Sequence, residues 1–249
     1  MGERVNYIQW GKEIVRQIEI HHTLGSTNEF GKTRLKSGGM SGTVLWALEQ
    51  KKGRGRRGRA WVSDQGSLTF SLIWRCPNPV LPSALTLTVG LGLVLELQQL
   101  VPELKVKWPN DLWIGEKKLG GILTETVRQA GQLWVILGVG LNVNSTPQAE
   151  VSPRTSLQEA SGCLWPRLGI LHCALKGVEL GFELADRGCN LSALFRRHGN
   201  FLHRPLQVFR GQESFVARAR DVLPDGRLLL ESARGLQAFL PDEIQLLLS

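Results

Sequence analysis

A segment of alternating glycines and arginines holds the residues of this chain that are best suited to bind an anion. It reads GRGRRGR from residue 53 to residue 59, with two lysines just before it and Trp61 just after it. Glycines let a backbone approach a ligand closely, and each guanidinium presents its N–H donors in a planar fork. The segment therefore predicts a loop that holds an anionic ligand.

Three other interpretations compete for this segment. Gly53, Gly55 and Gly58 have the spacing G-x-G-x-x-G, but a dinucleotide site needs a helix directly afterwards, and the residues from Arg59 onward do not predict one. Segments rich in arginine and glycine also bind RNA and single-stranded nucleic acids. A solvated basic loop is the simplest alternative, because runs of charge usually face water. Other parts of the chain must decide between them.

A second stretch brings a carboxylate and an ammonium close together. It reads KWPNDLWIGEKKLGG from residue 107 to residue 121. Pro109 cannot join a regular ladder, so Asp111 follows a kink between strands, where side chains are often functional. A two-residue turn at 115–116 makes a hairpin whose returning strand carries Lys118. We expect Asp111 and Lys118 to point into one pocket.

A third polar group lies at Ser26, Thr27 and Asn28. Short hydroxyl and amide side chains cap helices, so a plain helix start is the first interpretation. The same groups could instead hold a neutral polar group such as a ureido ring. The stretch from Gly25 to Thr33 also approaches a Walker A loop, but five residues rather than four separate its first two glycines.

The apolar patterns predict the elements that position these groups. A short helix should follow Ser26, and strands are expected at 43–48 and, half-buried, at 67–74, so the arginine-rich segment connects two strands. The stretch 85–101 predicts a buried core helix that ends near Pro102. Four further strands form a meander, at 105–108, 112–114, 119–127 and 133–143.

The last part of the chain changes character. Residues 155–158 resemble a capping box, and 168–195 predict a long helical region. Five short apolar runs follow, which predict a small β-barrel. We expect a catalytic domain at 1–202 and a C-terminal β domain at 203–249, an α+β protein with an all-β appendage.

Composition excludes several classes of protein. No run of about 18 uncharged apolar residues occurs, and the N-terminus lacks a signal peptide's apolar stretch, so we expect a cytoplasmic protein that does not bind membranes. The four cysteines form no CxxC and the five histidines no HExxH, which argues against a structural metal and a disulfide framework. The net charge of +8 favours anionic partners.

These segments, taken in order, resemble the biotin–protein ligases, also called biotin–acetyl-CoA-carboxylase ligases. The resemblance rests on the Ser26 group, GRGRRGR at 53–59, KWPNDL at 107–112 and GVGLNVN at 138–144. It implies a mixed β-sheet catalytic domain packed with helices, and a small SH3-like β-barrel at the C-terminus. Four matches in family order are far more specific than any one of them.

The resemblance implies roles for individual residues. The catalytic residues would be Lys118, Arg54 and Asp111. The biotin-binding residues would be Ser26, Thr27, Asn28, Gln50, Arg54, Gly55, Arg56 and Lys118. The residues that bind ATP or the adenylate would be Gly53, Arg56, Arg57, Arg59, Trp61, Asn110, Asn142 and Asn144.

The resemblance also implies the reaction and its partners. Biotin and ATP would be substrates, Mg²⁺ would enter with ATP, and the acceptor would be the biotin carboxyl carrier protein of acetyl-CoA carboxylase. Ser26 lies too near the start for a preceding helix-turn-helix domain, so we expect no specific nucleic acid and no repressor function. The protein would be a monomer or a homodimer. A lipoyl or octanoyl transferase or ligase and a non-enzymatic nucleic-acid-binding protein are the rival functions.

Overall fold

The computed structural model describes residues 6–9, 14–78, 80–145 and 153–248, and an eight-stranded sheet forms its centre. Strands β2 and β3 are parallel and every other neighbouring pair is antiparallel, which confirms the expected mixed sheet. Across the sheet the strands are β1 (Asn6–Gln9), β2 (Gln17–Leu24), β3 (Thr43–Gln50), β6 (Ser67–Arg75), β10 (Gln132–Asn142), β9 (Lys117–Gln129), β8 (Asp111–Ile114) and β7 (Leu104–Lys107).

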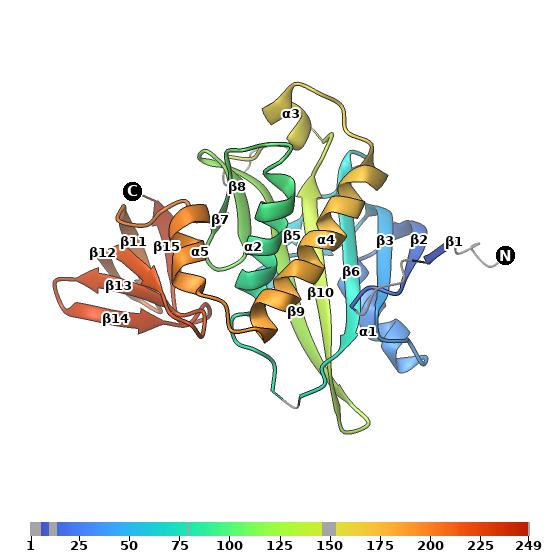
Figure 1. Cartoon of the computed structure of the whole chain (residues 1–249), viewed down its shortest axis with the longest axis horizontal. Coiled ribbons are helices and arrows are strands. Elements are labelled where there is room, and N and C mark those ends of the chain that lie inside the picture. The colour runs from blue at the N-terminus through green and yellow to red at the C-terminus, as the bar shows by residue number, and fades with distance from the viewer. Residues whose placement is uncertain (1–5, 10–13, 79, 146–152, 249) are drawn as a thin grey trace.

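Helices cover the two faces of this sheet unequally. The apolar helix α2 (Leu85–Leu97) and the long helix α4 (Arg167–Asp186) lie side by side on one face (Figure 1). Alternate residues of a strand point to opposite faces, and Val135 and Leu137 join this larger core. Ile136, between them, instead packs with α1 (Thr27–Lys36) on the other face, here called the α1 face.

Two helices approach each other closely because glycines lie where they cross. A Cβ at Gly92 of α2 would lie 2.1 Å from the Gly177 carbonyl oxygen, and a Cβ at Gly181 would lie 2.4 Å from the Val89 Cα atom. Backbone atoms cannot move aside as a flexible side chain can. These glycines therefore set the distance between α2 and α4, and with it the thickness of the core.

The C-terminal part forms a second, five-stranded antiparallel sheet. Its strand order is β14-β13-β12-β11-β15. Within the described residues its end strands are not paired with each other, and the antiparallel sheet is consistent with the expected SH3-like domain. The strands are β11 (Pro205–Arg210), β12 (Glu213–Val222), β13 (Leu228–Ser232), β14 (Gly235–Phe239) and β15 (Gln245–Leu248). The division into 1–202 and 203–249 stays a proposal.

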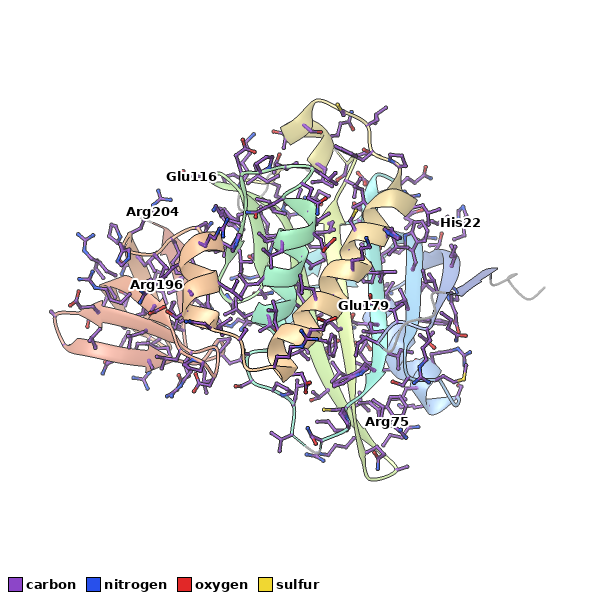
Figure 2. All side chains as sticks on the ribbon, viewed as in Figure 1. His22, Arg75, Glu116, Glu179, Arg196 and Arg204 are labelled. Carbon is purple, nitrogen blue, oxygen red and sulfur yellow. The ribbon has the colours of Figure 1, made fainter. Side chains whose placement is uncertain are left out.

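Polar contacts attach the second sheet to the first. The Trp108 indole Nε1–H donates to the Gly226 carbonyl at 2.9 Å. Arg204, just before β11, pairs at 2.9 Å with Glu116 in the turn between β8 and β9; both are labelled in Figure 2. Helix α5 (Leu191–His198) contributes Arg196, which pairs with Asp221 of β12 at 2.5 Å.

Three local expectations were wrong in detail. Strand β6 is buried along nearly its whole length rather than half-buried, because it lies in the middle of the sheet with covered faces. The N-cap of α3 (Leu157–Ser161) is Ser156, whose hydroxyl accepts the Glu159 N–H, so the cap lies one residue later than expected. The expected single helical region is divided into α4 and α5.

The remaining short elements belong to the arginine-rich segment. They are β4 (Gly53–Arg54), the 3₁₀ turn η1 (Arg56–Gly58) and β5 (Ala60–Trp61). The segment connects β3 to β6, as predicted, and β4 and β5 pair with each other. In the part of the chain that the structure describes, no helix is both long and apolar enough to cross a bilayer.

The crossing of α2 and α4 can be tested with two alanines in the same helix. Gly181→Ala should destabilise the protein by about 1–3 kcal/mol or more, because the new Cβ meets backbone. Gly169→Ala, also in α4, has nothing within 4 Å and should be neutral or stabilising by up to about 1 kcal/mol, since alanine favours helix. Urea unfolding measures both, and equal effects of the two substitutions would contradict the close crossing.

Candidate active site

The N-terminus of α1 carries a buried polar cluster on the α1 face. Ser26 is the N-cap residue, yet its side chain makes no capping hydrogen bond, and Ser26, Thr27 and Asn28 are all at least nine-tenths buried. The Gln50 side-chain carbonyl accepts the backbone N–H of Thr27 at 2.7 Å instead. A helix cap alone therefore does not explain these three residues.

Asn28 lies directly on the backbone of β10. A Cβ at Gly138 would come within 2.2 Å of Asn28 Oδ1, so only glycine leaves room for the carboxamide. The neighbouring strands supply its partners: Ser71 of β6 lies 2.6 Å from Oδ1, and Glu125 and the Leu123 carbonyl of β9 accept from Nδ2. The first glycine of GVGLNVN therefore makes space for a polar group.

The second glycine of the same motif makes space for an aromatic ring. A Cβ at Gly140 would lie 2.6 Å from the Trp61 indole, and a Cβ at Gly53 would lie 2.5 Å from the Trp61 carbonyl oxygen. The loop thus lies on the α1 face above β10. The Trp61 indole N–H is buried and has no hydrogen-bond partner among the described residues. It is an unused donor at the centre of the predicted site.

Lys118 and Asp111 form an ion pair at the other end of this face. Their Nζ and Oδ1 atoms are 2.6 Å apart, and both side chains are about one-quarter exposed, at 24% and 26%. Gly121 faces Asp111 across β8 and β9, and a Cβ there would lie 3.2 Å from Asp111 Oδ1 and 3.5 Å from Lys118 Nζ. The predicted meeting of Asp111 and Lys118 is confirmed.

Lys107 is a third charged residue of this cluster, and sequence reasoning missed it. It faces Asp111 across β7 and β8, and its ammonium lies 3.8 Å from the centre of the Trp113 ring. Burial lowers the pKa of Lys107, and Lys118 adds to the effect, while the Asp111 carboxylate opposes it. The hairpin register was the available signal, because it places residues 107 and 111 opposite each other.

The arginines of the loop point in different directions. Arg54 is 61% exposed and pairs with Glu29 of α1 at 3.2 Å. Arg56 donates to Asn110 Oδ1 at 3.1 Å and to the Pro241 carbonyl and Asp242 carboxylate, both at 2.9 Å. Asn110 is in turn held by the Ile122 carbonyl at 2.8 Å.

Arg57 and Arg59 complete the segment. Arg57 has a left-handed backbone, with φ of 57°, and donates to the Ile244 carbonyl at 2.9 Å. Arg59 is exposed, and its carbonyl accepts the Gly55 N–H at 2.8 Å. The loop therefore rests on residues 241–244, between β14 and β15, a contact that the sequence did not predict.

The two remaining predicted residues hold the backbone. Asn142 donates to the Thr155 carbonyl at 2.9 Å, and Asn144 bonds both the N–H and the carbonyl of Trp165, at 3.0 and 2.8 Å. These contacts fix the chain after β10 beside α3 and the start of α4. A direct role of the two asparagines in nucleotide binding stays a prediction.

The charged groups could assist reactions of anions. Two lysines flank the Asp111 carboxylate, and this excess of positive charge suits phosphate or carboxylate ligands. The polar cluster at α1 is neutral where it meets β10 and suits an uncharged polar ring. Across the residues that the structure describes, no group of three or more histidine, cysteine, aspartate or glutamate side chains could hold a metal ion.

Comparison with known proteins gives consistent matches. The model of the biotin/lipoate A/B protein ligase family matches residues 22–142. A biotin–acetyl-CoA-carboxylase ligase from Mycobacterium tuberculosis is 33% identical over 227 residues, which cover 87% of this chain and 84% of that protein. The bifunctional ligase/repressor BirA of Salmonella typhimurium is 31% identical over 239 residues, which cover 92% of this chain and 74% of that protein.

A solved structure matches nearly the whole fold. The biotin protein ligase from Aquifex aeolicus, in complex with biotin and ATP, superposes with a TM-score of 0.79 at 29% identity. The match covers 93% of this chain and 99% of that structure. Both sheets therefore have counterparts in a single known protein.

The charge cluster predicts how Lys107 titrates. In ¹³C spectra of the dimethylated protein, the Lys107 signal should titrate below the ordinary lysine pKa, because burial disfavours its ammonium. Asp111→Asn should lower that pKa further, since a carboxylate stabilises the charged form, and Lys118→Met should raise it. No response to either substitution would show that the three groups do not interact.

Proposed function

Since this chain belongs to the biotin/lipoate A/B protein ligase family, we propose that the α1 face of its main sheet is the active site of a biotin protein ligase. The proposed activity has two steps. Biotin and ATP first give biotinyl-5′-AMP and pyrophosphate. The biotinyl group then moves to a lysine of an acceptor protein, and AMP leaves.

The first step requires two anions to meet. A carboxylate oxygen of biotin attacks the α-phosphorus of ATP, and the bond to pyrophosphate breaks. Cations that are already in place stabilise this charge at little reorganisation cost, and one such group is typically worth about 2.7–4 kcal/mol. Lys118 is the central candidate because it lies on a rigid strand beside Asp111, with Lys107 as a neighbouring cation. Arg54 and Arg56 would close over the anions from the loop.

The neutral end of the site suits the biotin ring system. Ser26, Thr27, Asn28 and Gln50 offer hydroxyl and amide groups from α1 and β3, and none of these residues carries a formal charge. Ring binding at α1 would direct the biotin carboxylate along β10 toward Lys118. Trp61, above Gly140, would lie between the two ends. Gly53 and Gly55 would let the loop backbone approach the ligand.

The second step requires a neutral amine. The acceptor nitrogen attacks the acyl carbon of the anhydride, the acyl–oxygen bond to AMP breaks, and the amine proton must leave. Asp111 pairs with Lys118 at 2.6 Å, and in this proposal it would orient the acceptor amine and accept that proton. The Lys118–Asp111 pair is the single observation that best supports this mechanism.

Mg²⁺ enters as part of the substrate complex with ATP. It would neutralise phosphate charge, with Asp111 as a nearby carboxylate and the phosphates as its main ligands. Asn110, Arg57, Arg59, Asn142 and Asn144 are proposed near the nucleotide, with the loop arginines facing its phosphates. The proposed acceptor is the biotin carboxyl carrier protein of acetyl-CoA carboxylase. A net charge of +8 would favour an acidic carrier surface.

Pyrophosphate release tests the function directly. The protein should release pyrophosphate from MgATP when biotin is added, and should then label a biotin carboxyl carrier domain. Octanoate and lipoate serve as parallel substrates in the same assay. Silence with biotin and turnover with octanoate or lipoate would move the protein to a neighbouring activity, and silence with all three would refute the ligase function.

Adjacent lysines provide a matched test of the catalytic cation. Lys118→Ala should slow adenylate formation by about two to three orders of magnitude, because a preorganised cation is lost. Lys117→Ala removes the neighbouring ammonium, which is 52% exposed and pairs with Glu159, and should retain nearly full activity. Single-turnover formation of biotinyl-5′-AMP measures both. Equal rates for the two variants would remove Lys118 from the mechanism.

A further inference from the structure

Asn28 has only one way to orient its carboxamide. Its Nδ2 lies 2.8 Å from Glu125 Oε2 and 3.3 Å from the Leu123 carbonyl oxygen, and both of these atoms can only accept hydrogen bonds. Both N–H groups of the amide must therefore point toward β9. Its Oδ1 atom must face the opposite way, toward β6, where Ser71 Oγ lies 2.6 Å away.

That orientation determines the direction of the next two hydrogen bonds. Ser71 Oγ lies 2.6 Å from Asn28 Oδ1 and 2.7 Å from Thr27 Oγ1, and a hydroxyl has one proton to donate. Asn28 Oδ1 can only accept, so the Ser71 proton points to Asn28. The Thr27 hydroxyl must then donate its own proton to Ser71. Every proton of this Thr27–Ser71–Asn28 relay points toward Glu125.

Glu125 is itself held in place by an ion pair with Lys32. Its second oxygen, Oε1, accepts from the Lys32 ammonium at 2.7 Å, and Lys32 also reaches Glu29 at 2.9 Å. Burial lowers the pKa of Lys32, but the hydrogen bonds and charges of Glu125 and Glu29 outweigh it and raise the pKa. The ammonium therefore binds one oxygen of Glu125 and leaves Oε2 to accept from Asn28.

We propose that Glu125 is a positioning residue for biotin, which acts through the relay and makes Thr27 a hydrogen-bond acceptor in the site. With its proton committed to Ser71, the Thr27 oxygen has only lone pairs to offer, and it matches a ligand N–H. Gln50 would act as a donor, because its Oε1 already accepts the Thr27 N–H and its Nε2 would face the ligand. A ureido ring has both N–H donors and a carbonyl acceptor, so this inference deepens and rests on the proposed function.

Glu125→Gln tests the inference because it keeps the size and shape of the side chain but replaces a group that only accepts hydrogen bonds with one that can also donate them. The new amide can donate to Asn28 Oδ1, which lets the relay reverse. We expect the KM for biotin to rise about ten-fold, as one ligand hydrogen bond is lost, with kcat and the KM for ATP within about two-fold. Glu183→Gln, an exposed carboxylate on α4, is the control and should match the wild type.

A biotin analogue distinguishes the relay from general damage. Biotin that is N-methylated on its ureido ring lacks a donor, so the wild type should discriminate against it. That discrimination, the ratio of the two kcat/KM values, should fall about ten-fold in Glu125→Gln. Ser71→Ala, which interrupts the relay in its middle, should give a similar fall, and the double variant should lose little more than either single variant. A proportional loss for both ligands would reduce Glu125 to a structural role.

The relay can also be measured without any substrate. In ¹⁵N–¹H spectra, the side-chain amide of Asn28 should exchange slowly with solvent in the wild type and at least ten-fold faster in Glu125→Gln, because its hydrogen bond to the partly buried Glu125 carboxylate is lost. Fast exchange in the wild type would overturn the relay even if biotin is turned over. Slow exchange in a protein that ignores biotin would instead refute the ligase function and the ligand role of the relay, while the relay geometry would stand.

Discussion

The bare backbone of β10 at Gly138 and Gly140 is the constraint on which the rest of the site depends. A polar helix N-terminus and an indole ring both rest directly on a sheet, which is possible only where no Cβ stands in the way. Ser71 and Leu123 lie opposite Gly138 on the two neighbouring strands, and both hydrogen-bond the Asn28 side chain that rests on this glycine. A packed hydrophobic layer on this face, like the one beneath α2 and α4, would leave no room for a ligand.

The site separates neutral from charged recognition along one face. Hydroxyl and amide groups gather at α1, and the ammonium groups of Lys107 and Lys118 gather about the Asp111 carboxylate at the β7–β8–β9 edge. This separation follows from topology, since the strands that carry the two groups lie on opposite sides of β10. Biotin has the same polarity, with a neutral ring at one end and a carboxylate at the other. With biotin bound as proposed, this arrangement would orient the substrate before any reaction occurs.

Sequence reasoning found what local patterns encode. The ion pair of Asp111 and Lys118 could be predicted because a two-residue turn fixes which strand residues lie near each other. The five C-terminal strands could be predicted because turn residues separate the apolar runs. It missed Lys107, Glu125 and residues 241–244, because their roles arise from register and from contacts between distant segments. The alternation of polar and apolar residues in β6 predicted a half-buried strand for a related reason. Its serine and threonine residues are buried and do not face water. The order of the five C-terminal strands could not be predicted, because no local pattern reports which strands lie at the two ends of the sheet.

The contact between the arginine-rich loop and residues 241–244 ties ligand binding to the second sheet by thermodynamic reciprocity. Arg56 already donates to the Pro241 carbonyl and the Asp242 carboxylate. An anion that takes Arg56 from these partners gains binding free energy equal only to the difference between the new contacts and the lost ones. By reciprocity, the bound anion must change the free energy of the contact between the loop and residues 241–244 by the same amount. In the proposed site, substitutions on the surface of the C-terminal sheet would therefore change the affinity for the anion without contacting it.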